Sequence, residues 1–135
     1  MKYVAHRDYS GMTLDSSKVT VKIPKGTSLE CKDRLIWYDG VAVCMKDSYT
    51  GHRHFARDDD GRGLERGELT YKLAYAPRII EGTGYRFTDE ERKMISEKYS
   101  RWLKPKLCAI LFNDNFFSAD VDELKKFAER IFGGD

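Results

Sequence analysis

The sequence predicts an α+β fold, in which a small, strongly bent antiparallel β-sheet or SH3-like partial barrel forms the N-terminal half and C-terminal helices pack on it. Short segments of alternating apolar and polar residues, separated by turn sequences, predict strands in residues 1–47. Capping residues followed by apolar residues at helical spacing predict helices in residues 88–135. A chain of 135 residues is long enough for one hydrophobic core, so we expect a single domain.

Short strands are expected at residues 3–5, 19–23, 29–32, 35–38 and 41–45. Pro24 and Gly26 predict a turn before the third of these, because proline presets φ and glycine accepts a positive φ. Asp39-Gly40 between two apolar runs is the strongest short-range hairpin signal in the chain. Strands this short favour partial closure of the sheet, which protects its edges.

The middle of the chain, residues 48–76, is predicted to hold short helices around an Asp-Asp-Asp-Gly loop. Ser48 is placed to cap a helix that runs to Ala56. Residues 64–76 fit both helical and strand periodicity, and we favour a helix that the following proline ends. Residues 77–87 are expected to form a connection.

The last part of the chain, residues 88–135, is predicted to be mainly helical. Thr88 and Glu91 form a capping box for a helix that is expected to end at Pro105. The apolar run at 107–112 has the length of a strand. A final helix with an apolar stripe is expected to begin near Asp120.

Composition argues against several classes of protein. A net charge of +2, spread evenly, disfavours sequence-independent binding of nucleic acid. Three widely spaced cysteines predict reduced thiols rather than a disulfide framework. The chain shows no apolar run typical of a membrane span or signal peptide, so we expect a cytoplasmic protein without a membrane partner. We find no cofactor motif and no nucleophile beside an obvious base, which favours a binding protein over an enzyme.

The segment 52–66 holds the densest group of charges, with four arginines and four acids. In the structural interpretation, aspartates bond to nearby backbone, glycine accepts a positive φ and arginines pair with carboxylates to hold the loop. In the binding interpretation, the arginines project outward and bind an anion or an acidic partner. The candidate binding residues of this loop are Arg57, Asp58, Asp59, Asp60, Arg62, Glu65 and Arg66.

A third interpretation of the same segment is a metal site in a metal-dependent hydrolase. His52 and His54 are alternate residues that would share one face of a strand, and Asp58–Asp60 would supply oxygen ligands. The spacing fits neither an EF-hand loop nor a structural zinc site with a close CxxC pair. This interpretation is therefore the weakest of the three.

Trp37 and Tyr38 form a second candidate surface, on the predicted sheet. Adjacent strand residues face opposite sides, so one ring should lie in the core and the other should be exposed. An exposed aromatic ring on a small barrel can bind a peptide or stack on a nucleic-acid base. In the nucleic-acid alternative, phosphates are contacted by the lysines Lys22, Lys25 and Lys32.

Residues 55–70, FARDDDGRGLERGELT, resemble a sequence that marks a family of small proteins encoded by phages and prophages of Gram-positive bacteria. Residues 1–14, 21–31 and 113–120 and the closing helix are similar too, and residues 77–107 are the least alike. The resemblance implies a phage accessory protein inside a bacterial host and implies no catalytic residue. We therefore expect the chain to bind and modulate a host defence or housekeeping protein through the loop.

The two main interpretations of the loop differ in geometry. A structural loop requires a two-pronged bond from one of its arginines to one of its acids, and a positive φ at Gly61 or Gly63. Because Arg57 lies nearest to the apolar Phe55, we expect Arg57→Ala to lower stability more than Arg62→Ala.

Overall fold

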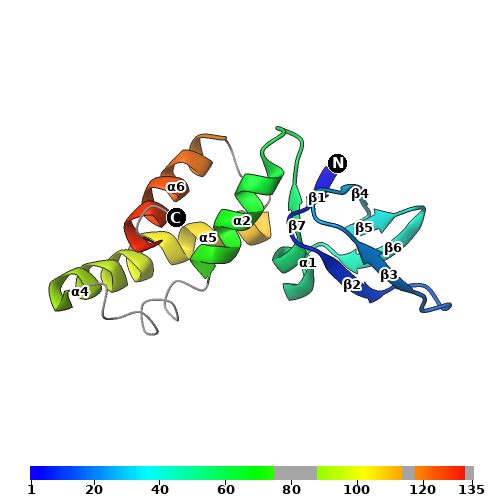
Figure 1. Cartoon of the computed structure of the whole chain (residues 1–135), viewed down its shortest axis with the longest axis horizontal. Helices are drawn as coiled ribbons and strands as arrows, with labels where there is room; N and C mark the ends of the chain where they lie inside the picture. Colours follow the sequence, from blue (N-terminus) through cyan, green and yellow to red (C-terminus); the bar gives the residue numbers. More distant parts are fainter. Residues whose placement is uncertain (75–87, 114–117, 133–135) are drawn as a thin grey trace. The chain divides into compact units, whose positions relative to one another are not determined.

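The computed structural model of the protein describes residues 1–74, 88–113 and 118–132 (Figure 1). It confirms the α+β class, with antiparallel strands in the N-terminal half and helices in the C-terminal half. The chain divides into two compact units, Met1–Glu68 and Leu69–Asp135. That the units form one domain, with the helices packed on the sheet, stays a prediction. The predicted connection at 77–87 lies outside the described residues.

The N-terminal unit contains two antiparallel sheets, one with the strand order β6-β5-β4-β1-β7 and one made of β2 and β3. Its strands are β1 (Lys2–Ala5), β2 (Tyr9–Met12), β3 (Thr20–Ile23), β4 (Ser28–Lys32), β5 (Leu35–Tyr38), β6 (Val41–Met45) and β7 (Phe55–Arg57). Helix α1 (Tyr49–His54) joins β6 to β7. Its cap is Ser48, as predicted, because the Ser48 hydroxyl accepts the N–H of Gly51 at 2.9 Å.

Both predicted turns of the sheet are confirmed. Asp39 and Gly40 have φ values of 52° and 78°, the left-handed pair that a two-residue hairpin turn requires. Between β3 and β4, Gly26 has a φ of 93° and the N–H of Thr27 bonds to the carbonyl of Pro24 at 3.2 Å. Strands β4, β5 and β6 therefore follow one another as a meander (Figure 1).

Hydrogen bonds between the two sheets close part of a barrel. The N–H of Leu14, just after β2, bonds to the carbonyl of Ala42 in β6 at 2.9 Å. Close by, the Tyr9 hydroxyl donates to the carbonyl of Val43 at 3.2 Å. This arrangement fits the SH3-like partial barrel that the sequence predicts. Its core consists of Tyr3, Ala5, Tyr9, Ile23, Leu29, Cys31, Ile36, Val43, Cys44 and Phe55.

Strand β7 lies at one border of the larger sheet. It pairs with β1 through the bonds Asp58 N–H to Lys2 carbonyl (2.8 Å) and His6 N–H to His54 carbonyl (2.9 Å). In this pattern the backbone groups of Phe55 and Arg57 point away from β1. The Phe55 N–H bonds to the carbonyl of Gly51, and the Arg57 carbonyl accepts from the guanidinium of Arg66.

The described helices that follow are α2 (Gly63–Ala74), α4 (Asp89–Lys98), the π-helix η2 (Tyr99–Leu103), α5 (Lys104–Asn113) and α6 (Ser118–Phe132). Helix α2 confirms the helical alternative over residues 64–74, the described part of the predicted range, and Thr88 caps α4 as predicted. The C-terminal unit has its own apolar cluster, made of Leu73, Ile95, Leu103, Leu107, Leu124, Phe127 and Ala128.

Two predictions for this unit are wrong. Pro105 does not end the helix, because it is the second residue of α5, and residues 107–112 are helical rather than extended. The N–H of Lys104 bonds to the carbonyl of Tyr99, five residues back. This wider turn directly precedes Pro105 and accommodates a residue that has no N–H and that would clash in a regular helix. An apolar run alone does not distinguish a strand from a buried helix.

His6, which follows β1, is a fully buried polar residue of the N-terminal unit. One of its ring nitrogens, Nε2, lies 3.2 Å from the carbonyl of His52 and must carry the proton, because a carbonyl only accepts. The ring packs closely against α2, since a Cβ added at Gly67 would lie 2.3 Å from it. Burial lowers the pKa of His6 from 6.5 to about 4.

This buried histidine should make folding sensitive to mild acid. Between pH 6.5 and about 4 the unfolded chain binds a proton at His6 that the folded chain does not. The free energy of unfolding should therefore decrease with falling pH, by at most about 1.4 kcal/mol per pH unit. His6→Gln keeps a donor for the His52 carbonyl but does not titrate, so urea unfolding of this variant should depend less steeply on pH. Equal slopes for the two proteins would contradict this assignment.

Candidate functional site

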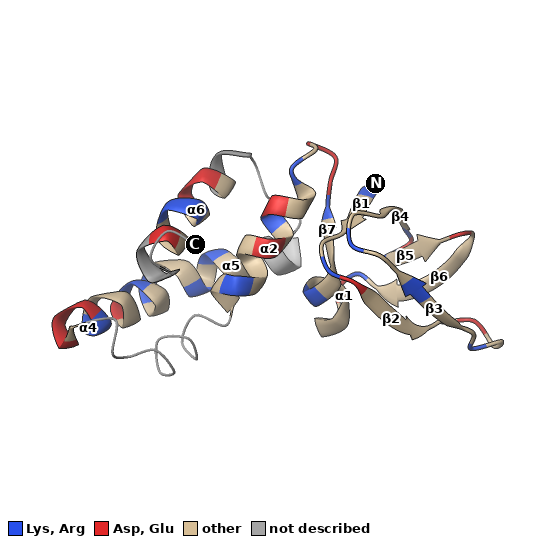
Figure 2. Cartoon of the chain, viewed as in Figure 1, with Lys and Arg blue, Asp and Glu red and all other residues tan. Residues whose placement is uncertain are grey.

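The loop between β7 and α2 carries acidic and basic residues (Figure 2), and hydrogen bonds of its own side chains hold it. Asp58 accepts the N–H of Gly63 at 2.7 Å and so caps the start of α2. Asp60 accepts the N–H of Arg62 at 3.1 Å. Between them, Gly61 has a φ of 77°, as the structural interpretation requires.

Each arginine that was considered as a ligand contact is paired inside the loop. Arg57 donates to Asp59 at 2.6 Å, and Arg62 donates two N–H groups to one oxygen of Glu65, at 3.2 and 2.9 Å. Arg66 donates to the carboxylate of Asp60 and to the carbonyl of Arg57. The required two-pronged bond is therefore present, at Arg62.

The arginine with a buried side chain is Arg66, not Arg57 as the sequence suggested. The side chain of Arg66 is 5% exposed, against 37% for Arg57 and 29% for Arg62. Proximity to Phe55 in the sequence was misleading, because Arg57 lies on the outermost strand. Arg66 instead lies on the first turn of α2, which faces back toward that strand.

The loop also fixes the beginning of β1. Asp59 accepts the backbone N–H of Lys2 at 2.8 Å, and Asp58 lies 3.7 Å from the ammonium of Lys2. The Lys2 N–H and the Arg57 guanidinium hold the pKa of Asp59 below its usual value. These contacts connect the loop to a groove on the neighbouring strands.

The histidines of the metal interpretation do not lie on a strand. His52 and His54 belong to α1, where residues two apart point in different directions. A ring nitrogen of His54 bonds to the carbonyl of Thr50 at 2.9 Å. Across residues 1–74, 88–113 and 118–132, no group of three histidine, cysteine or acidic residues is arranged to hold a metal ion.

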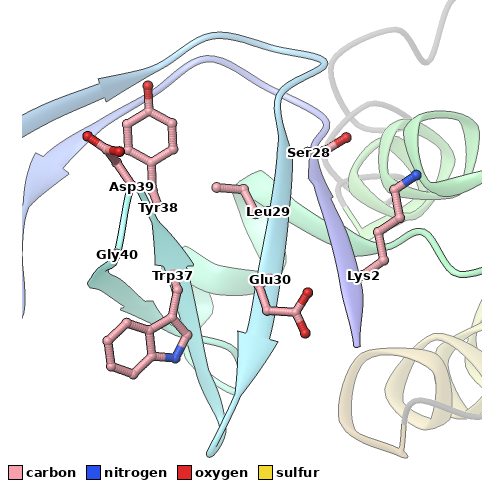
Figure 3. A pocket seen from close by; sticks show the side chains of 8 residues that line it. All are labelled: Lys2, Ser28, Leu29, Glu30, Trp37, Tyr38, Asp39 and Gly40. Atoms are coloured by element: carbon pink, nitrogen blue, oxygen red, sulfur yellow. The ribbon is translucent and has the colours of Figure 1, made fainter.

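Trp37 and Tyr38 both line a groove of about 860 Å³, and their rings point in opposite directions (Figure 3). It is open to solvent and lies over β1, β4, β5 and the turn after β5. We call it the aromatic groove, and the residues that line it are Lys2, Ser28, Leu29, Glu30, Trp37, Tyr38, Asp39 and Gly40.

The two aromatic rings of this groove are held differently. Trp37 lies opposite Glu30 on β4, on the outer face of the sheet, and its indole N–H donates to the carbonyl of Lys32 at 3.0 Å. Tyr38 packs against the apolar core. The rings therefore belong to opposite faces of β5, as predicted, but both are half-buried rather than one buried and one exposed.

The charges of the groove do not suit a nucleic acid. It is lined by two carboxylates, Glu30 and Asp39, and by one ammonium, that of Lys2. None of the lysines that were expected to contact phosphates lines it, and Lys25 forms an ion pair with Glu68 at 3.2 Å. A phosphate backbone would meet net negative charge here.

Sequence reasoning did not identify Lys2, Ser28 and Glu30 as site residues. They reach the groove because β1 and β5 both pair with β4, which places Lys2 and Trp37 on either side of Glu30. The alternation of apolar and polar residues in β4 could have identified Ser28 and Glu30 as exposed, because the first, third and fifth residues of this strand are exposed.

The chain was compared with protein-family models, with curated proteins and with solved structures. None of them matches. Within the described residues, no helix combines the length and apolar character needed to cross a bilayer.

Proposed function

We propose that the protein is a phage accessory protein that binds a host protein in the bacterial cytoplasm, and that the aromatic groove is its binding surface. The observation that carries this proposal is the indole of Trp37, half-buried and held by a hydrogen bond at the wall of an open groove. A fixed aromatic side chain in a groove is the kind of residue that dominates the binding energy of protein interfaces. The phage context rests on the resemblance of residues 55–70 and of the chain ends.

We prefer the groove to the charged loop because the charged groups of the loop are already paired in the free protein. The carboxylates and guanidinium groups of the loop already bond to each other and to the backbone. A ligand would have to break these bonds before it gained new ones. The ring of Trp37, in contrast, can be contacted without such an exchange.

Replacement of Trp37 should abolish the interaction with the host partner. The full chain, immobilised, is exposed to host lysate beside Trp37→Ala, and retained proteins are quantified. The partner should decrease about ten-fold or more, since truncation of a central tryptophan commonly costs at least about 2 kcal/mol. Trp102→Ala is the matched control, because Trp102 is the other tryptophan of the chain and lies in the C-terminal unit.

Two further variants make the result decisive. Trp37→Phe retains an aromatic ring and should keep most of the binding, which separates loss of contact from loss of folding. The double variant Arg57→Ala, Arg62→Ala removes two half-exposed loop pairs and should retain the partner. A partner that survives Trp37→Ala, or that is lost only with the loop variant, would move the binding surface away from the groove.

A further inference from the structure

Two of the three charged side chains that line the aromatic groove are carboxylates. Of its three charged side chains, Lys2 has its ammonium 3.7 Å from Asp58, which does not line the groove. Figure 3 shows the Lys2 side chain directed away from Trp37. The carboxylates of Glu30 and Asp39 are the other two charged groups of the lining.

One of these carboxylates already accepts a cation in the structure. The amino group of Met1 lies 2.7 Å from an oxygen of Glu30, although the Glu30 side chain is 63% exposed. The hydrogen bond to Glu30 raises the pKa of this amino group. A ligand ammonium or guanidinium group that reaches this exposed carboxylate from solvent would take the place of the Met1 amino group.

Trp37 is the cross-strand neighbour of this glutamate. Glu30 and Trp37 are directly opposite each other on β4 and β5, a relation that puts the Cβ atoms of two residues about 5 Å apart. A cation at this point can bond to the carboxylate and also lie over the ring. A guanidinium group suits both contacts best, because it is planar and stacks on aromatic faces while it donates in pairs to a carboxylate.

We propose that the aromatic groove binds an extended protein segment through an arginine or lysine, whose cationic group lies over Trp37 against Glu30. This inference rests on the proposed function and specifies the class of ligand. Asp39, at the other end of the groove beside Tyr38, provides a second negative position for a further basic residue of the same segment (Figure 3).

Peptide libraries test the role of the charge directly. Nine-residue peptides with acetylated and amidated ends are randomised at every position except the fifth, which is arginine, citrulline or glutamate. Retention on the immobilised full chain is measured, and selected peptides are titrated by fluorescence with Trp102→Phe, which leaves Trp37 as the one tryptophan. The arginine library should be retained at least ten-fold better than the citrulline library, because citrulline has the shape of arginine without its charge.

The contribution of Glu30 is tested by Glu30→Gln, which removes the negative charge and keeps the size and shape of the side chain. Affinity for selected arginine peptides should fall about ten-fold at low salt, and added salt should reduce the difference. Asp33→Asn is the matched control, because Asp33 lies in the neighbouring turn between β4 and β5 and does not line the groove. Lys2→Ala should not weaken binding.

Failure of this inference and failure of the proposed function give different results. Equal retention of arginine and citrulline peptides, with binding still lost in Trp37→Ala, would overturn the ligand class and leave the groove as a binding surface. Preference for the glutamate library or for a single-stranded oligonucleotide would also overturn it. Absence of any peptide or host protein whose binding depends on Trp37 would remove the proposed function itself.

Discussion

Arg66→Ala should lower the free energy of unfolding by about 3 kcal/mol, because it leaves the carboxylate of Asp60 and the carbonyl of Arg57 without their guanidinium partner in a largely buried place. Arg62→Ala and Arg57→Ala should each cost less than about 1 kcal/mol, since their ion pairs are about one third exposed. Urea unfolding of the three variants beside the wild type measures the ranking. If Arg66→Ala cost no more than Arg62→Ala, the guanidinium of Arg66 would not be buried in solution.

Gly67→Ala should destabilise the N-terminal unit by about 2–3 kcal/mol, even though alanine favours a helix. The added methyl group would lie 2.3 Å from ring atoms of His6, which is fully buried and held by the His52 carbonyl. Either α2 or the histidine ring has to move. Thermal unfolding of the variant gives the size of the effect.

The double variant His6→Ala, Gly67→Ala identifies the cause of that loss. Removal of the ring makes room for the methyl group, so the two substitutions should be strongly non-additive. Gly61→Ala serves as a comparison, because a Cβ at Gly61 meets no atom within 4 Å and its cost arises from the φ of 77° alone. Additive losses at positions 6 and 67 would show that the helix does not pack on the ring as described.

The sequence predicted best those strands whose signal lies within the strand itself and in the turn beside it. Residues 41–45 are apolar and follow an Asp-Gly turn, and the observed strand has the predicted bounds. Strands β2 and β7 were missed for a physical reason. In β2 only Tyr9 is buried, and β7 follows α1 without an intervening turn residue, so neither shows an alternating pattern.

The candidate site was harder to predict than the fold, because its members meet through long-range pairing. Trp37 was recognisable as an aromatic residue on a strand, but Glu30 becomes its neighbour only through the register of β4 with β5. For the charged loop, short-range contacts could be predicted and long-range contacts could not. Its pairing within a few residues was foreseen, whereas the burial of Arg66 depends on how α2 returns toward β7.

The position of Arg66 also has a consequence for the behaviour of the protein at high concentration. An outer strand with open backbone groups is a template on which a second chain can add a strand, and this is a common route to aggregation. On β7 the outward N–H of Phe55 is taken by α1 and the outward carbonyl of Arg57 is taken by Arg66. The same guanidinium that holds the loop therefore takes one of the backbone groups through which a second chain could add a strand to β7.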